Sequence, residues 1–162
     1  MKTKKLTISA MFIAIGVLCG NIIYIPIGAS KCFPIQHTIN IISAVMLGPF
    51  YAVLNAFAIS LLRNFMGTGS ILAFGGSMIG AFLSGIFYKY SKNNILAVIG
   101  EVFGTGIIGG TISIPIAKFL MGSGSLSFFV YIVPFTLSSL SGGIIAYIIL
   151  KSKDLVKLMC KF

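Results

Sequence analysis

The chain consists of long apolar stretches that short polar segments separate. They fall at residues 6–26, 34–47, 49–65, 71–88, 95–117 and 128–150. Crossing the hydrocarbon core of a bilayer takes about 20 apolar residues in a helix. Inside lipid, a helix satisfies its own backbone hydrogen bonds. We therefore predict an all-α integral membrane protein with six transmembrane helices, forming a single domain over residues 1–162.

The composition excludes a soluble fold. Hydrophobic residues make up 57% of the chain and charged residues 9%, whereas soluble domains carry roughly a quarter charged residues. A net charge of +10 in a soluble chain would suggest a nucleic-acid partner. In a membrane protein the basic residues instead mark the faces of the bilayer, so we expect lipid and no nucleic acid around this chain.

The basic residues predict the topology. Cytoplasmic loops carry an excess of Lys and Arg. With the N-terminus inside, three basic residues lie outside: Lys31, Arg63 and Lys118. Nine lie inside: Lys2, Lys4, Lys5, Lys89, Lys92, Lys151, Lys153, Lys157 and Lys161. We predict that both termini are cytoplasmic and that the protein lies in the cell membrane.

The second stretch is too short to span a bilayer alone. Its 14 residues make a helix about 21 Å long, against about 30 Å of hydrocarbon. Either the neighbouring loop helps it across, or it packs inside the bundle and turns at Gly48-Pro49. The glycine-rich segments 75–80 and 104–110 predict close approach between helices, as small residues allow in lipid.

The sequence lacks the residues that several kinds of chemistry require. The sequence contains no Gly-x-x-x-x-Gly-Lys-Ser/Thr phosphate loop, no His-Glu-x-x-His and no Cys-x-x-Cys. Glu101 and Asp154 are the only acids, and the three cysteines, Cys19, Cys32 and Cys160, are widely spaced. We therefore expect no enzyme, no metal site and no cofactor. An ATP-driven step would need a partner subunit.

Polar chemistry is concentrated in residues 28–40. This segment holds the only His and the only Gln of the chain, His37 and Gln36. His37 and Asn40 are three residues apart and share one helix face, and Phe33 in the preceding loop can stack on a flat ring. We interpret Phe33, Gln36, His37 and Asn40 as ligand contacts. In the alternative, His37 and Asn40 cap the helix or bond between helices.

Other candidates lie on the remaining helices. Arg63 and Asn64 end the third stretch at the outer level, where Arg63 either faces the cavity or snorkels to the interface. Ser77 and Tyr131 are candidates from predicted depth alone.

Glu101 is the sole acid within a predicted span. Counted from the cytoplasmic boundary it lies about 9 Å deep, level with Asn55. An unpaired charge there is costly, so we expect Glu101 to face the bundle interior. It either bonds to Asn55 or forms the floor of a ligand cavity. The predicted depths of Glu101 and His37 differ, which argues against one pocket containing both.

These features together resemble a known family. Six spans in about 160 residues and Ala10-x-x-x-Ala14 in the first helix resemble a substrate-binding S-component of an energy-coupling factor (ECF) vitamin transporter. Phe33-Pro-x-Gln-His-x-x-Asn40 and Glu101-x-x-Gly-Thr-Gly-Ile-Ile-Gly109 are similar to ThiW, the S-component assigned to the thiazole precursor of thiamin. The resemblance covers essentially the whole chain, and the Phe-Pro-x-Gln-His segment is its more distinctive motif.

The resemblance implies a function and partners. The ligand, hydroxyethylthiazole, would be held from the outside under the first loop. Ala10 and Ala14 would meet the transmembrane coupling subunit, and two ATPase subunits would drive transport. Thiamin or its pyrimidine precursor are alternative ligands. A standalone secondary transporter and a purely structural membrane subunit are the alternative classes of protein.

Overall fold

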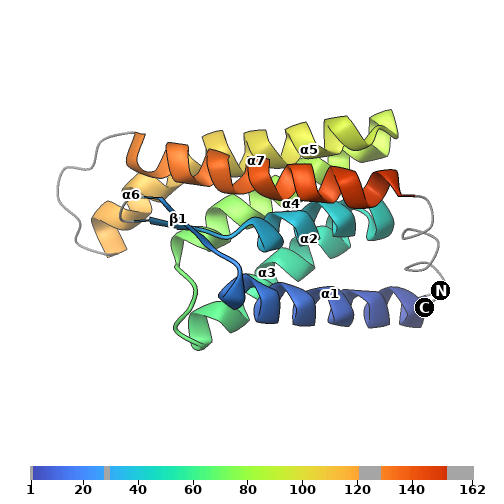
Figure 1. Ribbon diagram of the computed structural model, residues 1–162, viewed down its shortest axis with the longest axis horizontal. Coiled ribbons are helices and arrows are strands. Elements are labelled where there is room, and N and C mark those ends of the chain that lie inside the picture. Colours follow the sequence, from blue (N-terminus) through green and yellow to red (C-terminus); the bar gives the residue numbers. More distant parts are fainter. Residues whose placement is uncertain (1, 28–29, 121–128, 153–162) are drawn as a thin grey trace.

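The computed structural model describes residues 2–27, 30–120 and 129–152. These residues form an elongated bundle of helices with one short hairpin (Figure 1). The elements are α1 (Lys2–Ile22), β1 (Ile25–Ile27), β2 (Ser30–Cys32), α2 (Pro34–Leu47), α3 (Pro49–Phe65), α4 (Leu72–Ser91), α5 (Asn94–Val102), η1 (Phe103–Gly109), α6 (Gly110–Leu120) and α7 (Phe129–Lys151).

The helix boundaries confirm most of the predicted stretches. Proline at the first helical position begins α2 and α3, and both helices have the predicted bounds. Asn93 caps α5 because its side chain accepts a hydrogen bond from the backbone N–H of Ile95 (2.9 Å). The predicted stretch 95–117 is α5, η1 and α6 in succession. Residue 128, where the last stretch was predicted to begin, lies outside the described residues.

The hairpin was not predicted. β1 and β2 pair antiparallel, with Ile25 opposite Cys32 and Ile27 opposite Ser30. They lie at the end of the bundle where α6 ends (Figure 1). The predicted all-α fold class therefore describes these residues correctly except for the hairpin. The hairpin leads directly into α2.

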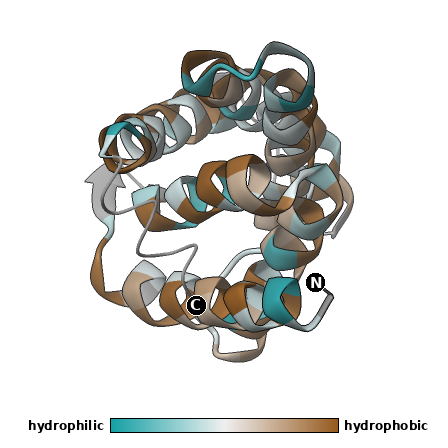
Figure 2. Cartoon of the chain, turned by 90° about the vertical axis from the view of Figure 1, so that its right-hand side faces the viewer, coloured by the Kyte–Doolittle hydropathy of each residue, from teal (hydrophilic) through white to brown (hydrophobic). Residues whose placement is uncertain are grey.

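α2 is the central helix of the bundle. It packs against α1, α3, α4, α5 and α7, and most of its residues are buried. Figure 2 looks along the bundle from the end where α1 begins and shows hydrophobic residues along the helices that surround the centre. Of the two explanations for its short length, packing inside the bundle is therefore confirmed.

Glycines bring α4 against the π-helix η1. A Cβ added to Gly104 would lie 2.7 Å from the Cα of Gly80, which is closer than real Cβ contacts come. Gly109 packs against Gly76 in the same way, about one turn further along η1. The close approach predicted from these glycine-rich segments is confirmed. It places the residues of η1 directly beside α4.

Four of the described helical segments are long and apolar enough to cross a membrane. They are Thr3–Gly20, Leu72–Ser91, Asn94–Phe119 and Val130–Lys151. α2 and α3, with 14 and 17 residues, are shorter than such a span. Lys5, Lys89 and Lys151 belong to helix ends at one end of the bundle, and Lys118 belongs to the other (Figure 1). Lys153, Lys157, Lys161, Asp154 and Cys160 lie outside the described residues.

Candidate ligand-binding site

A cavity of about 670 Å³ lies at the hairpin end of the bundle. Its walls come from α2, α3, α4, η1, α7 and the loop between α3 and α4. Pockets of about 300–1,000 Å³ are typical of small-molecule sites. The described residues therefore enclose a space suited to a small ligand.

The cavity unites most of the residues that the sequence singled out. Seven of the nine predicted site residues line it: Phe33, Gln36, His37, Arg63, Asn64, Ser77 and Tyr131. Asn40 and Glu101 are not among the lining residues. They lie behind His37 and Ser77 and are completely buried. Residues 28 and 29 of the predicted polar segment lie outside the described residues.

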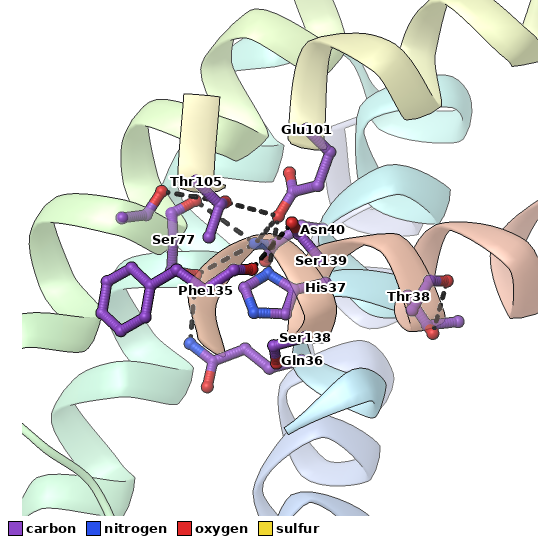
Figure 3. Close-up of polar contacts among 12 residues, drawn as sticks. Gln36, His37, Thr38, Asn40, Ser77, Glu101, Thr105, Phe135, Ser138 and Ser139 are labelled. Carbon is purple, nitrogen blue, oxygen red and sulfur yellow. Dashed lines mark hydrogen bonds and ion pairs between the residues drawn. The ribbon is translucent and has the colours of Figure 1, made fainter. Parts of the chain in front are cut away.

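Glu101 joins α5 to the central helix. Its Oε1 lies 2.8 Å from Nδ1 of His37, and it accepts hydrogen bonds from Asn40 Nδ2 (2.9 Å) and Thr105 Oγ1 (3.1 Å). Figure 3 shows these side chains converging on one carboxyl oxygen. An ionised carboxylate only accepts hydrogen bonds, so with Glu101 ionised it is Nδ1 of His37 that donates in this contact. Nε2 is then the ring nitrogen left for another partner.

Of the two alternatives for Glu101, the hydrogen bond to Asn55 is wrong, because Asn55 Nδ2 donates to Ser43 Oγ instead (3.0 Å). The predicted depth difference between Glu101 and His37 is also absent. It assumed that α2 reaches the outer boundary, whereas 14 residues extend only about 21 Å. The first turn of α2 therefore lies deep in the bundle, within reach of the Glu101 side chain.

Gln36 is held by partners on both sides. Its Oε1 accepts from Arg63 Nη1 (2.6 Å), and its Nε2 donates to Ser60 Oγ (2.9 Å) and Ser77 Oγ (3.0 Å). Asn40 Nδ2 also donates to Ser77 Oγ (3.0 Å). These bonds tie α2 to α3 and α4, and they fix the orientation of the Gln36 amide.

Arg63 is a wall residue of the cavity. Its side chain is 1% exposed, so the alternative of an arginine snorkelling to the interface is wrong. Nη2 donates to the carbonyl of Thr68 (3.1 Å), and the guanidinium carbon lies 3.9 Å from the centre of the Phe33 ring. Phe33 therefore does stack on a flat group, but that group is the guanidinium of Arg63.

Two hydrogen bonds fasten the hairpin end to α7. The backbone N–H of Phe33 donates to Ser138 Oγ (2.8 Å), and the Cys32 thiol donates to the carbonyl of Pro134 (3.1 Å). Burial of Cys32 raises the pKa of its thiol above the ordinary value. This anchoring holds Phe33 over the cavity.

The comparison with protein families gives a clear match. The sequence model of the family described as "Thiamine-precursor transporter protein (ThiW)" matches residues 6–154, which is most of the chain. The chain belongs to the ThiW family. It is thus a transporter protein and not an enzyme, and with its long apolar helices it is a multi-pass membrane protein. Comparisons with curated proteins and with solved structures gave no match.

Several wall residues of this ThiW protein were missed by sequence reasoning. Ser60, Thr105, Phe135 and Ser138 line the cavity but were not predicted. Helical spacing was an available signal for all four. Thr105 lies four residues after Glu101, and Ser60 lies three before Arg63. Phe135 and Ser138 lie four and seven residues after Tyr131 on α7, so each of the four shares a helix face with a predicted residue.

The two alanines of the predicted coupling motif lie far from the polar cluster. Ala10 and Ala14 of α1 are both exposed, whereas Phe12 between them is buried. The two positions are four residues apart and share one face of the helix. In this ThiW protein no described residue covers that face of α1.

Proposed function

We propose that this chain is the substrate-capture subunit of an ECF-type importer and that it binds a thiamine precursor in the cavity. The observation that carries the proposal is the cavity itself. It brings together Phe33, Gln36 and His37, the distinctive motif residues, in a member of a thiamine-precursor transporter family. Hydroxyethylthiazole is the first candidate ligand. Thiamin and its pyrimidine precursor are alternatives, because they too combine aromatic rings with polar groups.

The cavity offers a small ring compound both apolar and polar contacts. Phe135, Tyr131 and Leu72 supply apolar surface, and His37 Nε2 supplies a polar partner. Such a mixture of mainly apolar walls and a few placed polar groups is typical of small-molecule sites. We assign substrate contact to the lining residues, and we assign support of His37 and Ser77 to Asn40 and Glu101.

In this proposal the protein crosses the cell membrane six times, with both termini in the cytoplasm and the cavity opening outside. The distribution of lysines supports this orientation, because Lys5, Lys89 and Lys151 lie at the end away from the cavity. α2 and α3 form the two short spans, and α2 is packed inside the bundle.

Ala10 and Ala14 would bind the coupling subunit, which works with two ATPase subunits. Their exposure on α1 and the close packing that small residues allow support this role. Replacing both by Leu should reduce co-purification of the coupling subunit, while ligand binding by the isolated chain persists. Met11→Phe, which enlarges an exposed neighbour, is the matched control.

The decisive experiment is a search for bound ligand. Native mass spectrometry of gently extracted protein should show a co-purifying small ring compound, and titration should show saturable binding of hydroxyethylthiazole, thiamin or the pyrimidine precursor. A folded preparation that binds none of the three, and no anionic derivative of them, would reject the proposal. Uptake into liposomes by this chain alone would favour a standalone secondary transporter.

A further inference from the structure

Arg63 places a buried positive charge in the cavity wall. Its side chain is 1% exposed, and its contacts are neutral: the amide oxygen of Gln36, the carbonyl of Thr68 and the ring of Phe33. Glu101 is the one acid among the described residues. Its carboxyl group is engaged by His37, Asn40 and Thr105 instead. Within the described part of the chain, Arg63 therefore has no carboxylate partner.

The guanidinium retains unused hydrogen-bonding capacity. It has five N–H groups, and hydrogen bonds to Gln36 and Thr68 use two of them. Its Nε has no acceptor among the described residues. A buried charge is costly unless a counter-charge or hydrogen bonds compensate it. The ring of Phe33 compensates part of this cost through a cation–π contact, but it supplies no negative charge.

The hydroxyl groups of Ser60 and Ser77, beside Arg63, can also donate hydrogen bonds. Ser77 Oγ accepts from Gln36 and Asn40, and Ser60 Oγ accepts from Gln36. A hydroxyl has one hydrogen to donate, and both hydroxyls line the cavity with that hydrogen available. Both side-chain polar atoms of Gln36 are already engaged, by Arg63 and by Ser60 and Ser77.

We infer that the cavity takes a ligand carrying an anionic group, a carboxylate or a phosphate, and that Arg63 binds this group with Ser60 and Ser77. The inference rests on the proposed function and changes the expected ligand from the neutral hydroxyethylthiazole to an anionic derivative of a thiamine precursor, such as its phosphate ester. Arginine binds carboxylate and phosphate with charge-assisted, often bidentate hydrogen bonds. His37 Nε2 and Asn64 Oδ1 remain to bind a donor elsewhere on the ligand.

Three compounds that share the same thiazole ring test the inference. They are the neutral alcohol hydroxyethylthiazole, its phosphate monoester, and the carboxymethyl analogue. Binding is measured by calorimetry with purified protein in lipid nanodiscs. We expect one anion to bind about tenfold or more tightly than the alcohol. The tighter of the two anions identifies the group as phosphate or carboxylate. Raising the salt from about 0.05 M to about 0.5 M KCl should weaken anion binding more than alcohol binding.

Two variants test the role of the positive charge of Arg63: one removes the charge, and the other neutralises it with a neighbouring carboxylate. Arg63→Gln removes it, and Gln36→Glu gives Arg63 an internal carboxylate at the position where Gln36 Oε1 now lies 2.6 Å away. Both should bring the ratio of anion to alcohol affinity close to one. Lys89→Gln makes the same change in net charge at an exposed site outside the cavity lining and should keep the wild-type ratio. Thermal unfolding midpoints report whether each variant is folded.

The outcomes separate this inference from the proposed function. If the alcohol binds as tightly as both anions, or if both variants keep the anion preference, the inference is overturned and the capture function stands. If the wild-type protein prefers an anion and either folded variant loses that preference, the inference is supported. Binding of none of the three thiazoles, together with no binding of thiamin or the pyrimidine, would reject both.

Discussion

Nδ1 of His37 lies 2.8 Å from Oε1 of Glu101, and both side chains are buried where α2 meets α5. The contact joins two residues that are 64 positions apart in the sequence. It fixes one ring nitrogen of His37 and leaves the other for the cavity. His37 is therefore both a lining residue and a link in the interior of the bundle.

Glu101→Ala should destabilise the fold. The change removes an acceptor shared by His37, Asn40 and Thr105. Asn40 keeps Ser77 and Thr105 keeps the carbonyl of Gly76, so the main loss is at Nδ1 of His37, which has no other partner among the described residues. We expect the free energy of unfolding to fall by roughly 2–4 kcal/mol, seen as a lower thermal midpoint in detergent. Glu101→Gln keeps an acceptor oxygen and should lose less. Equal midpoints for Glu101→Ala and the wild type would contradict this account.

His37→Ala should weaken ligand binding about tenfold or more, because it removes a polar contact in the cavity wall. Insertion into the membrane should be unaffected, since the apolar helices remain. Thr38→Val is the matched control. Thr38 is in the same turn, donates to the carbonyl of Gly142 (2.9 Å) and points away from the cavity (Figure 3). Unchanged affinity in purified His37→Ala protein would remove His37 from the site.

Gly104→Ala should lower the free energy of unfolding by about 1–3 kcal/mol, as overpacking does. Its added Cβ would lie 2.7 Å from the Cα of Gly80 and 3.0 Å from the carbonyl oxygen of Ile79, and backbone atoms cannot easily move away. Gly75→Ala is the control, because its nearest neighbour would be a methyl group of Ile112 at 3.7 Å. Thermal unfolding of both variants measures the difference, and similar losses would argue against the close α4–η1 packing.

Cys32 should react slowly with thiol reagents. Burial raises the pKa of its thiol, so at a given pH less thiolate is present than in the unfolded chain, and the alkylation rate should rise only at higher pH. The measurement uses a variant in which Cys19 and Cys160 are replaced by Ser, alkylated across a pH series. The same variant in denaturant is the control. Equal rates in the two conditions would show that Cys32 is not buried against α7.

The bounds of α2 and α3 were predicted well because local chemistry determines them. Pro34 and Gly48-Pro49 each mark a helix boundary by a mechanism that acts within a few residues. The end of the first stretch was wrong, because α1 ends at Ile22 and the predicted residues 25 and 26 belong to β1. Relative depth was predicted less well, because it depends on how far the short α2 is sunk into the bundle. The rotation of α3, which turns Arg63 away from lipid, depends on packing across helices. No periodic signal in the sequence reveals the π-helix or the partners of Glu101.

The π-helix η1 makes the wall of the cavity sensitive to chain length as well as to residue type. Its seven residues are wound more widely than an α-helix, so a segment that loses one residue there can revert to α-helical winding. Side chains after η1 would then keep their orientation relative to Glu101, because an α-helix covers the same rotation with one residue fewer. Within η1, Thr105 and the glycines that face α4 would lose their alignment. A deletion in α6 would instead turn every later side chain of that helix by about 100°.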